Sequence, residues 1–329
     1  MGNLVDQLAD ATGLRNLDQL DLSLVGLLCE TLPLRRASVL ASFSDGEAKR
    51  WYLRASQRPG ESLPHSDALT VRMDELPLRE EQALLARCAD EQRMCCQALP
   101  DGGVHTALPL FDDAGMEGVL ELESDAPLEG TQMRLLGSIL RFYGNFRCLV
   151  FDNERDQLTG LYNRKPFDDH FGRAQELVAK GGSWLAVLDI DHFKRVNDQY
   201  GHLVGDEVLL LIGRLLRGSF RFSDKAFRFG GEEFLLLLRG TDETDAQRIV
   251  DSFRIKVAQQ EFPQVGRITV SIGFTLLLGD DTPHSALERA DRAVYAAKQA
   301  GRDRALGFEQ LVRDGQLEPQ QSVGSVDFF

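Results

Sequence analysis

The sequence predicts an α+β protein built from two domains. Its 329 residues are enough for two domains of ordinary size, and 43% hydrophobic with 27% charged residues is typical of folded proteins. Residues 105–111 are predicted to form a strand that turns at 112–115, and residues 118–123 return with clean alternation of apolar and polar side chains, which predicts an antiparallel hairpin in the first half. In the second half an apolar strand, helices, a second hairpin, a helix, a strand and a helix follow in order. This order favours a mainly antiparallel sheet flanked by helices.

The first half is expected to be a mixed domain around a central antiparallel sheet. Periodic apolar residues predict helices over 17–30 and 79–90, and runs of β-forming residues predict strands over 37–43, 48–55, 105–111 and 118–123. Turns are expected at 44–47 and 112–115, where aspartate and glycine occur together. Residues 57–70 are rich in proline, glycine and serine, which predicts a loop.

A long helix is expected over residues 131–155. Its apolar residues fall at spacings of 4, 3, 4 and 3, which is the pattern of two coiled-coil heptads. The residues of this stripe are Leu135, Ile139, Phe142, Phe146 and Leu149. Two heptads leave two interpretations open. The stripe packs on the sheet of its own domain, or it forms a parallel dimer helix that transmits a signal.

The second half is expected to form a palm-like domain with a ferredoxin-like arrangement. The predicted strands are 184–190, 225–229, 234–238 and 267–277, and the predicted helices run from 164 or 166 to 180, within 205–218, over 242–260 and over 282–300. Pro166 suits a first helical turn, and Gly181 and Gly182 suit a helix end. The expected organisation is a first domain over 1–130, a linker helix over 131–155, the palm over 156–308 and a polar tail over 309–329.

Charge and cysteine content exclude several classes of protein. The formal net charge is −14 and no long basic run occurs, so general binding to nucleic acid or to anionic membranes is not expected. The five cysteines are odd in number, contain no C-x-x-C and lie in the first half, as in a cytoplasmic protein with reduced thiols. Neither a signal peptide nor an apolar stretch of roughly 18 residues is present, so no membrane span is expected.

Acidic residues follow two predicted strands of the second half. The apolar strand 184–190 runs into Asp189 and Asp191, and a Gly-Gly turn 43 residues downstream (232 − 189) leads into Glu232 and Glu233. Burying a carboxylate is costly unless it is paired or binds a metal, so packing alone does not explain these acids. If the two strands are neighbours, the acids lie together. A site with oxygen ligands and no histidine or cysteine suits Mg²⁺ or Mn²⁺, which also bind substrate phosphates.

Three motifs around these acids resemble those of the GGDEF family, the diguanylate cyclases. They are Asp189-Ile-Asp-His-Phe-Lys-x-x-Asn-Asp198, Gly201-His-x-x-Gly-Asp206 and Gly230-Gly-Glu-Glu-Phe234. Further matches are Asp156-Gln-Leu-Thr-Gly-Leu-Tyr-Asn-Arg164, Ser271-Ile-Gly273, Asp291-x-Ala-x-Tyr-x-Ala-Lys298 and Gly301-Arg302. The resemblance covers residues 156 to about 306, and several spaced motifs in order make it specific.

The resemblance implies an enzyme that joins two GTP molecules into cyclic di-GMP and releases pyrophosphate. It implies that Asp189, the Ile190 carbonyl and Glu232 hold Mg²⁺ or Mn²⁺, and that Glu233 completes the acidic cluster. Metals there would bridge the phosphates and lower the pKa of the attacking 3′-hydroxyl. Glu232 is the best candidate to accept the proton of that hydroxyl.

The resemblance also implies a set of residues that bind the substrate. Asn197 and Asp206 are expected to read guanine, because the carboxylate accepts from the base N1–H and amine while the amide complements the other edge. The remaining expected contacts are with the triphosphate. They come from Lys194, Lys298 and Arg302 and from the backbone at His192 and Phe193.

Two GTP molecules must meet head to tail, so the active species is expected to be a homodimer. Arg221 and Asp224 stand at the family's spacing for an inhibitory product site, where cyclic di-GMP would bind and arrest catalysis. The strand–turn–strand pattern of the first domain resembles GAF-type sensory domains, with a PAS-like domain as the next choice. Its ligand or protein signal would control the catalytic domain through the linker helix.

Two other classes of function stay open. The first is a binding module, a GGDEF-like domain that receives GTP or cyclic di-GMP without turnover. The complete signature, with Asp189, both glycines and both glutamates present, argues for an enzyme instead. The second is a nucleotidyl cyclase that accepts ATP or mixed substrates, against which Asn197 and Asp206 argue.

Overall fold

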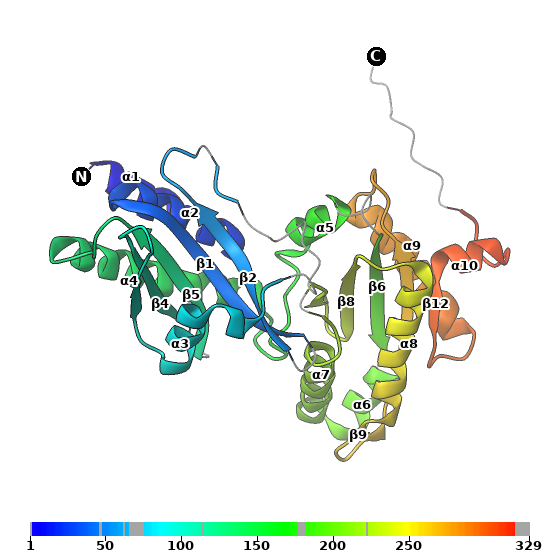
Figure 1. Cartoon of the computed structure of the whole chain (residues 1–329). Coiled ribbons are helices and arrows are strands. Elements are labelled where there is room, and N and C mark those ends of the chain that lie inside the picture. Colours follow the sequence, from blue (N-terminus) through cyan, green and yellow to red (C-terminus); the bar gives the residue numbers. More distant parts are fainter. Residues whose placement is uncertain are drawn as a thin grey trace. The chain divides into compact units, whose positions relative to one another are not determined.

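The computed structural model describes residues 2–45, 48–61, 63–65, 76–112, 115–176, 182–221 and 223–319. The chain divides into two compact units, Met1–Glu154 and Arg155–Phe329, and each has its own sheet and its own hydrophobic core (Figure 1). In the described parts of the chain, no helix combines the length and apolarity needed to cross a membrane.

The first unit contains a five-stranded antiparallel sheet in the order β2-β1-β5-β4-β3. Its strands are β1 (Leu34–Asp45), β2 (Ala48–Gln57), β3 (Cys95–Ala98), β4 (Val104–Asp112) and β5 (Gly115–Ser124). The predicted hairpin is confirmed, because β4 and β5 pair antiparallel with Leu108 opposite Leu120. Strand β3 was not predicted, since its four residues expose three side chains and show no apolar alternation.

Helices of the first unit largely follow the predicted pattern. They are α1 (Gly2–Ala11), α2 (Leu17–Thr31), α3 (Ala83–Glu91) and α4 (Thr131–Glu154), with a 3₁₀ turn η2 (Arg79–Glu81). The predicted helix 79–90 is wrong at its start, because Gln82 has φ −110° and ψ 73° and separates η2 from α3. Residues 46–47, 113–114 and parts of the loop 57–70 lie outside the described residues.

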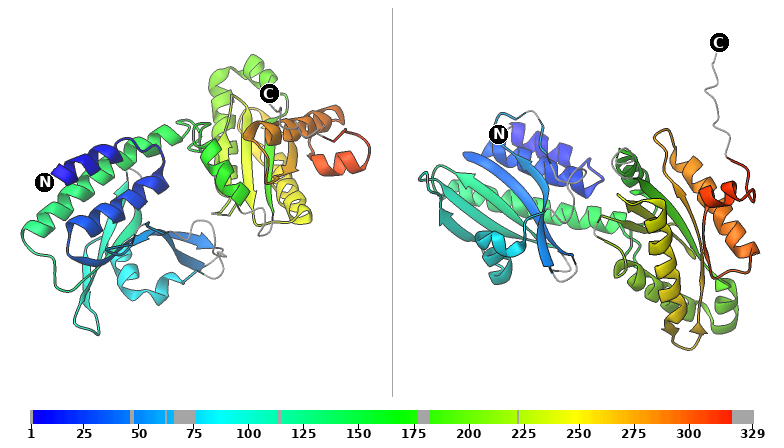
Figure 2. Two further views of the ribbon diagram at one scale, coloured as in Figure 1. Left: turned by 90° about the horizontal axis from the view of Figure 1, so that it is seen from above. Right: turned by 45° about the vertical axis from the view of Figure 1, so that its right-hand side comes forward.

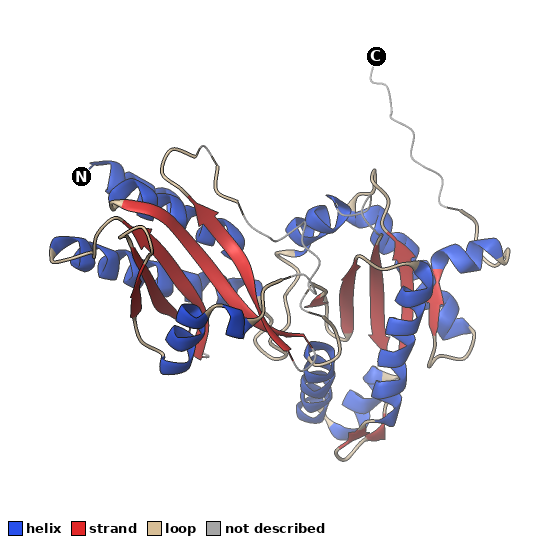
Figure 3. Cartoon of the chain, viewed as in Figure 1, coloured by secondary structure: helices blue, strands red, loops and turns tan. Residues whose placement is uncertain are grey.

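The two faces of the first sheet bury different helices (Figure 2). Val39 and Leu122 lie on the face covered by α2 and α4, whereas Trp51 and Val119 lie on the face covered by α3. Strand side chains alternate between faces, so the consecutive apolar residues Val119 and Leu120 of β5 supply one face each. Figure 3 shows the same layering of helices on strands.

Helix α4 packs on its own unit with a face next to the predicted stripe. Its buried apolar residues are Leu136, Ile139, Tyr143 and Val150. Of the predicted stripe only Ile139 is buried, and Leu149 is 65% exposed. Successive side chains of an α-helix are rotated by 100° about its axis. The residues that pack on the sheet can therefore form a row next to the predicted stripe. Leu135 and Phe146 of the stripe are partly buried against the same core. Of the two interpretations, the structure supports packing on the first sheet, and a dimer contact through the stripe stays a prediction.

A buried charged network ties α4 to α2 and β2. The Asp21 carboxylate is fully buried and accepts hydrogen bonds from the Tyr143 hydroxyl and, at 3.1 Å, from Nη1 of Arg147. Arg54 forms an ion pair with the same carboxylate. Burial, followed by the charge of Asp21, raises the pKa of Tyr143. Removing one partner of such a buried pair typically costs about 3–5 kcal/mol, so this network anchors the helix firmly.

The second unit contains a five-stranded sheet in the order β12-β11-β6-β8-β7. Its strands are β6 (Ser183–Ile190), β7 (Lys225–Arg228), β8 (Glu233–Arg239), β11 (Val270–Leu276) and β12 (Ala305–Gly307), and a small hairpin joins β9 (Glu261–Phe262) to β10 (Gly266–Arg267). All pairs in the large sheet are antiparallel except β11 with β12. The apolar strand and the Gly-Gly hairpin are thus confirmed as neighbours, in agreement with the predicted mainly antiparallel sheet.

Helices cover both faces of this sheet. They are α5 (Phe167–Glu176), α6 (Phe193–Tyr200), α7 (His202–Arg217), α8 (Glu243–Gln259), α9 (Pro283–Gln299) and α10 (Phe308–Arg313). Leu188 and Leu236 face α6, α7 and α8, whereas Val187 and Leu235 face α5 and α9. Residues 177–181, the predicted end of the first helix, lie outside the described residues. Helix α6 was not predicted.

The predicted polar tail is wrong for its first part. Residues Phe308–Arg313 form α10, and Phe308 and Leu311 are buried against Ala293 of α9. Glu309 accepts a hydrogen bond of 3.0 Å from the Leu276 amide, which fixes α10 to β11. These few apolar residues among polar ones gave too short a periodic signal to predict a helix. Residues 320–329 lie outside the described part of the chain.

Candidate active site

Strand pairing brings the two acidic segments together. In the antiparallel pair of β6 and β8, Asp189 lies directly opposite Glu233, and Glu232 precedes β8 in the turn. Residues opposite each other in such a pair point to the same face, with Cβ atoms about 5 Å apart. The prediction that these acids lie together, made from an apolar strand and a Gly-Gly hairpin, is therefore confirmed.

A lysine from α9 completes the cluster. Nζ of Lys298 lies 2.7 Å from Oδ2 of Asp189, and the two side chains are 32% and 13% exposed. Lys298 stands in the last turn of α9, opposite the end of β6. The predicted phosphate ligand is thus placed beside the predicted metal ligand, and the two form an ion pair.

Burial and, to a smaller extent, like charges raise the pKa of two acids of the cluster. Burial, with smaller contributions from Asp189 and Glu233, raises the pKa of Glu232, and Lys298 opposes this. Burial and the charge of Glu233 also raise the pKa of Asp291 on α9. Asp291 therefore belongs to the electrostatic environment of the site. The sequence placed Asp291 in a helix motif and gave it no role. The periodicity of a helix does not show which strands it will pack beside.

The second acid after β6 has a structural role. Asp191 is buried and accepts hydrogen bonds from Oγ1 of Thr269 at 2.6 Å, Oγ of Ser271 at 2.7 Å and the Asp303 amide at 3.1 Å. Three donors satisfy its charge away from the cluster. The loop that it holds includes Arg302, which adopts a left-handed φ of 64°. Asp191 thus positions a predicted phosphate ligand through its loop.

The donor set fits a hard divalent cation, although not a metal cage made by the protein alone. Among the described residues, no three histidine, cysteine or acidic side chains are grouped so that they could hold one ion. Mg²⁺ usually binds through one or two carboxylates together with water and substrate phosphates. Asp189, Glu232 and the Ile190 carbonyl supply such a partial set, so the residues present fit the expected metal.

The predicted guanine ligands stand on two consecutive helices. Asn197 lies on α6 and Asp206 on α7, separated by the bend at Gly201. A Cβ built on Gly205 would lie 2.0 Å from Oδ1 of Asn197, so a larger residue there would push the Asn197 side chain out of its position. The Asn197 amide thus lies against Gly205 of α7, one residue before Asp206, which carries the carboxylate.

The predicted phosphate ligands divide into side chains and backbone. Lys194 is exposed at the start of α6, whereas the Phe193 side chain is buried in the core and leaves only its backbone for a ligand. His192 precedes α6 with a left-handed φ of 59°. Backbone N–H groups at a helix start can bind an anion, which agrees with the expected role of this segment.

The predicted inhibitory site is a turn whose acid already has partners. The Asp224 carboxylate accepts from the backbone amides of Arg221 at 3.1 Å and Arg239 at 3.3 Å. Burial raises the pKa of Asp224, and those two amide bonds oppose the shift. Arg221 is exposed, and the residue between them at 222 lies outside the described residues. The structure therefore places Arg221 as the member whose side chain faces solvent.

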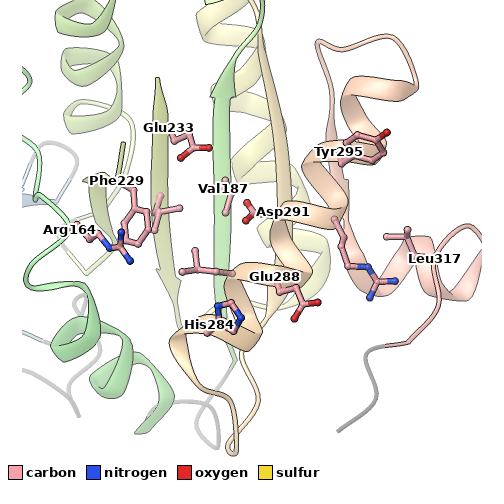
Figure 4. A pocket seen from close by; sticks show the side chains of 12 residues that line it. Arg164, Val187, Phe229, Glu233, His284, Glu288, Asp291, Tyr295 and Leu317 are labelled. Carbon is pink, nitrogen blue, oxygen red and sulfur yellow. The ribbon is translucent and has the colours of Figure 1, made fainter. Parts of the chain in front are cut away.

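A cavity of about 670 Å³ adjoins the acidic cluster (Figure 4). Val187 and Leu235 line it from the sheet, and Glu233 and Asp291 line it where it meets the cluster. Arg164 lies over the Phe229 ring at 4.8 Å on another side of the cavity. Of the predicted substrate and metal residues only Glu233 is among its lining residues, so this cavity is distinct from the predicted guanine site.

Comparison with known proteins identifies the class of the second unit. Residues 153–304 match the family model described as "Diguanylate cyclase, GGDEF domain". This part of the chain is a GGDEF domain.

Curated relatives share this region. The chain is 44% identical over 157 residues to the diguanylate cyclase DgcP of Pseudomonas aeruginosa, covering 45% of this chain and 23% of that protein. It is 38% identical over 160 residues to the response regulator PleD of Caulobacter vibrioides, covering 46% of this chain and 35% of that protein. The chain thus spans well under half the length of either relative.

One solved structure shares the same region. The coiled coil and GGDEF domain of DgcB from Caulobacter crescentus, solved in complex with c-di-GMP, is 32% identical to this chain. The likeness covers 54% of this chain and 100% of that one, with a TM-score of 0.49.

Proposed function

We propose that this protein is a diguanylate cyclase that condenses two GTP molecules into cyclic di-GMP and two pyrophosphates. The observation that carries the proposal is the pairing of Asp189 opposite Glu233, with Lys298 on the same carboxylate and Glu232 in the adjoining turn. The GGDEF domain over residues 153–304 supports it. The reaction would depend on Mg²⁺ or Mn²⁺, held by Asp189, Glu232 and the Ile190 carbonyl.

Each residue of the cluster has a role in this reaction. A bound divalent metal would supply charge at the phosphates and lower the pKa of the 3′-hydroxyl. Glu232 would accept the proton of that hydroxyl. Glu233 adds negative charge beside it. Lys298 and Arg302 hold triphosphate oxygens, with Lys194 and the backbone of residues 192–193 at the start of α6.

Selection of guanine falls to Asn197 and Asp206. The carboxylate accepts from N1–H and the exocyclic amine of guanine, and the amide pairs with the carbonyl edge. Adenine offers the opposite pattern at these positions, which would leave polar groups unpaired. A site of this kind can reject the wrong base by several orders of magnitude.

The reaction needs two copies of the domain. Each binds one GTP, and the 3′-hydroxyl of each attacks the α-phosphate of the other, so we propose a homodimer with two-fold symmetry. We further propose that the first unit is a GAF-like sensory domain. Its signal would alter the distance or angle between the two catalytic domains through α4.

The test is an assay of the full chain with GTP and Mg²⁺ after bound nucleotide has been removed. Product is identified by chromatography and mass. Cyclic di-GMP that accumulates supports the proposal, and ATP in place of GTP tests base selection. No product at concentrations where the protein is dimeric, with GTP binding intact in a titration, would favour a receptor module instead.

Replacing Arg221 with alanine is expected to weaken product inhibition about tenfold, because one charged contact to the product is lost. The cyclic di-GMP concentration at which the rate falls to half should rise by that factor. Arg221 is the better test than Asp224, whose carboxylate also holds the turn through two backbone amides. Initial rates at increasing product are compared with those of Arg214→Ala, which removes an exposed arginine of α7. Equal inhibition in all three proteins would place the inhibitory product elsewhere.

A further inference from the structure

The ion pair between Lys298 and Asp189 occupies the carboxylate that the proposed metal needs. The two charged atoms lie 2.7 Å apart, at the distance of a strong charge-assisted hydrogen bond. The positive charge of Lys298 also acts on Glu232 and Asp291. Burial raises the pKa of both acids, and Lys298 opposes that rise. Lys298 is thus the cation that compensates this cluster in the described structure.

We propose that Lys298 acts as a built-in counter-ion that is exchanged for metal when nucleotide binds. In the free protein its ammonium holds Asp189. A triphosphate then draws the ammonium away, and Asp189 becomes available to a divalent cation. The proposal rests on the proposed function only in assuming that the site binds metal and nucleotide.

The two partners differ in their freedom to move. Asp189 is near the end of a central strand, paired on both sides with β8 and β11, and its side chain is 13% exposed. Lys298 reaches it from α9 on a flexible four-carbon stem and is 32% exposed. The lysine can therefore leave by rotating its own side chain, whereas the carboxylate stays where the sheet holds it.

Charge balance sets the direction of the exchange. Asp189, Glu232, Glu233 and Asp291 bring up to four negative charges to the cluster, and Lys298 brings one positive charge. An added divalent cation must displace the ammonium from Asp189, which weakens metal binding in the absence of nucleotide. An added triphosphate offers the ammonium a new anionic partner and removes that competition.

Metal and nucleotide should consequently bind with positive coupling. Coupling between sites is reciprocal, so each ligand raises the affinity for the other by the same factor, typically 5–150-fold. Lys298 is in this view a positioning residue for the metal as well as a phosphate ligand. Free metal would bind more weakly until substrate arrives.

The test is Mn²⁺ binding to the full chain, measured by electron paramagnetic resonance in the absence of nucleotide. Lys298→Met is expected to bind Mn²⁺ about tenfold more tightly than the native protein, because the competing charge is gone. Lys298→Arg retains the charge and should stay close to native affinity. Lys256→Met is the matched control, since Lys256 contacts Ser219 outside the site.

The same titration with a GTP analogue that resists attack at the α-phosphate gives the second readout. Nucleotide should tighten Mn²⁺ binding strongly in the native protein and much less in Lys298→Met. Native or weaker Mn²⁺ affinity of Lys298→Met without nucleotide, in a protein with an unchanged circular dichroism spectrum, would overturn the exchange. If the affinities shift as expected but no cyclic di-GMP forms in the GTP assay, the exchange stands and the cyclase proposal fails.

Discussion

Replacing Glu232 with glutamine is expected to lower the rate of cyclic di-GMP formation at least about a thousandfold while the fold is retained. The amide has the shape of the carboxylate but neither binds a divalent cation strongly nor accepts the hydroxyl proton. General base catalysis alone typically contributes about 10²–10⁴-fold. The fold should tolerate the change, because burial, and after it the charges of Asp189 and Glu233, disfavour the ionised Glu232 carboxylate and raise its pKa.

The measurement is the initial rate of product formation at saturating GTP and Mg²⁺, together with a thermal melt. Glu288→Gln is the matched control, because Glu288 is an exposed acid on α9 that lines the neighbouring cavity. It should keep activity within a factor of about three of the native rate. A rate for Glu232→Gln within tenfold of native would contradict its assignment as metal ligand and base.

Replacing Gly273 with alanine is expected to lower the free energy of unfolding of the second unit by about 3 kcal/mol or more. A Cβ at this position of β11 would lie 2.3 Å from both the Ala290 carbonyl oxygen and the Val294 amide nitrogen. These are backbone atoms of α9, which cannot rotate away as a side chain would. The whole helix must shift, and with it Lys298 and Asp291.

The measurement is urea unfolding followed by the fluorescence of Trp184, in a Trp51→Phe background so that only the second unit reports. Trp184 is buried and donates to the Thr241 carbonyl, so its signal changes when that core opens. Gly279→Ala is the control, since no atom lies within 4 Å of its added methyl group. If Gly273→Ala lowers the free energy of unfolding by less than about 1 kcal/mol, α9 packs less tightly on β11 than these contacts indicate.

Much of the second unit could be predicted because its signals are local. The apolar run of β6 and the Gly-Gly turn each identify an element from a few residues, and an antiparallel neighbour of β6 brings Asp189 near Glu233. Thr282 similarly marks the start of α9, where its side chain accepts from the Ser285 amide. In these elements the pattern and the tertiary contacts agree.

Features that depend on distant partners could not be predicted. Asp191 looks like a second site acid, yet its donors are a threonine just before β11, a serine within β11 and an amide in the loop after α9, all far away in the sequence. The sequence predicts an apolar stripe on α4, but it does not predict which face of the helix packs on the first sheet. The Asp21 network and that sheet determine this. Lys298 could be assigned to phosphate from its motif, but not to Asp189, because only the packing of α9 brings them together.

The short strand β12 has a practical meaning for any fragment of this protein. The family match ends at residue 304, whereas Ala305–Gly307 pairs in parallel with Ile272–Phe274 of β11. A fragment that stops at the end of the match would turn β11 into an open sheet edge, with a row of unpaired backbone groups. It would also uncover the apolar surface of Ala293 that Phe308 and Leu311 shield. Such an edge is a template for pairing with another chain, so aggregation of the short fragment would reflect a missing strand rather than an unstable enzyme.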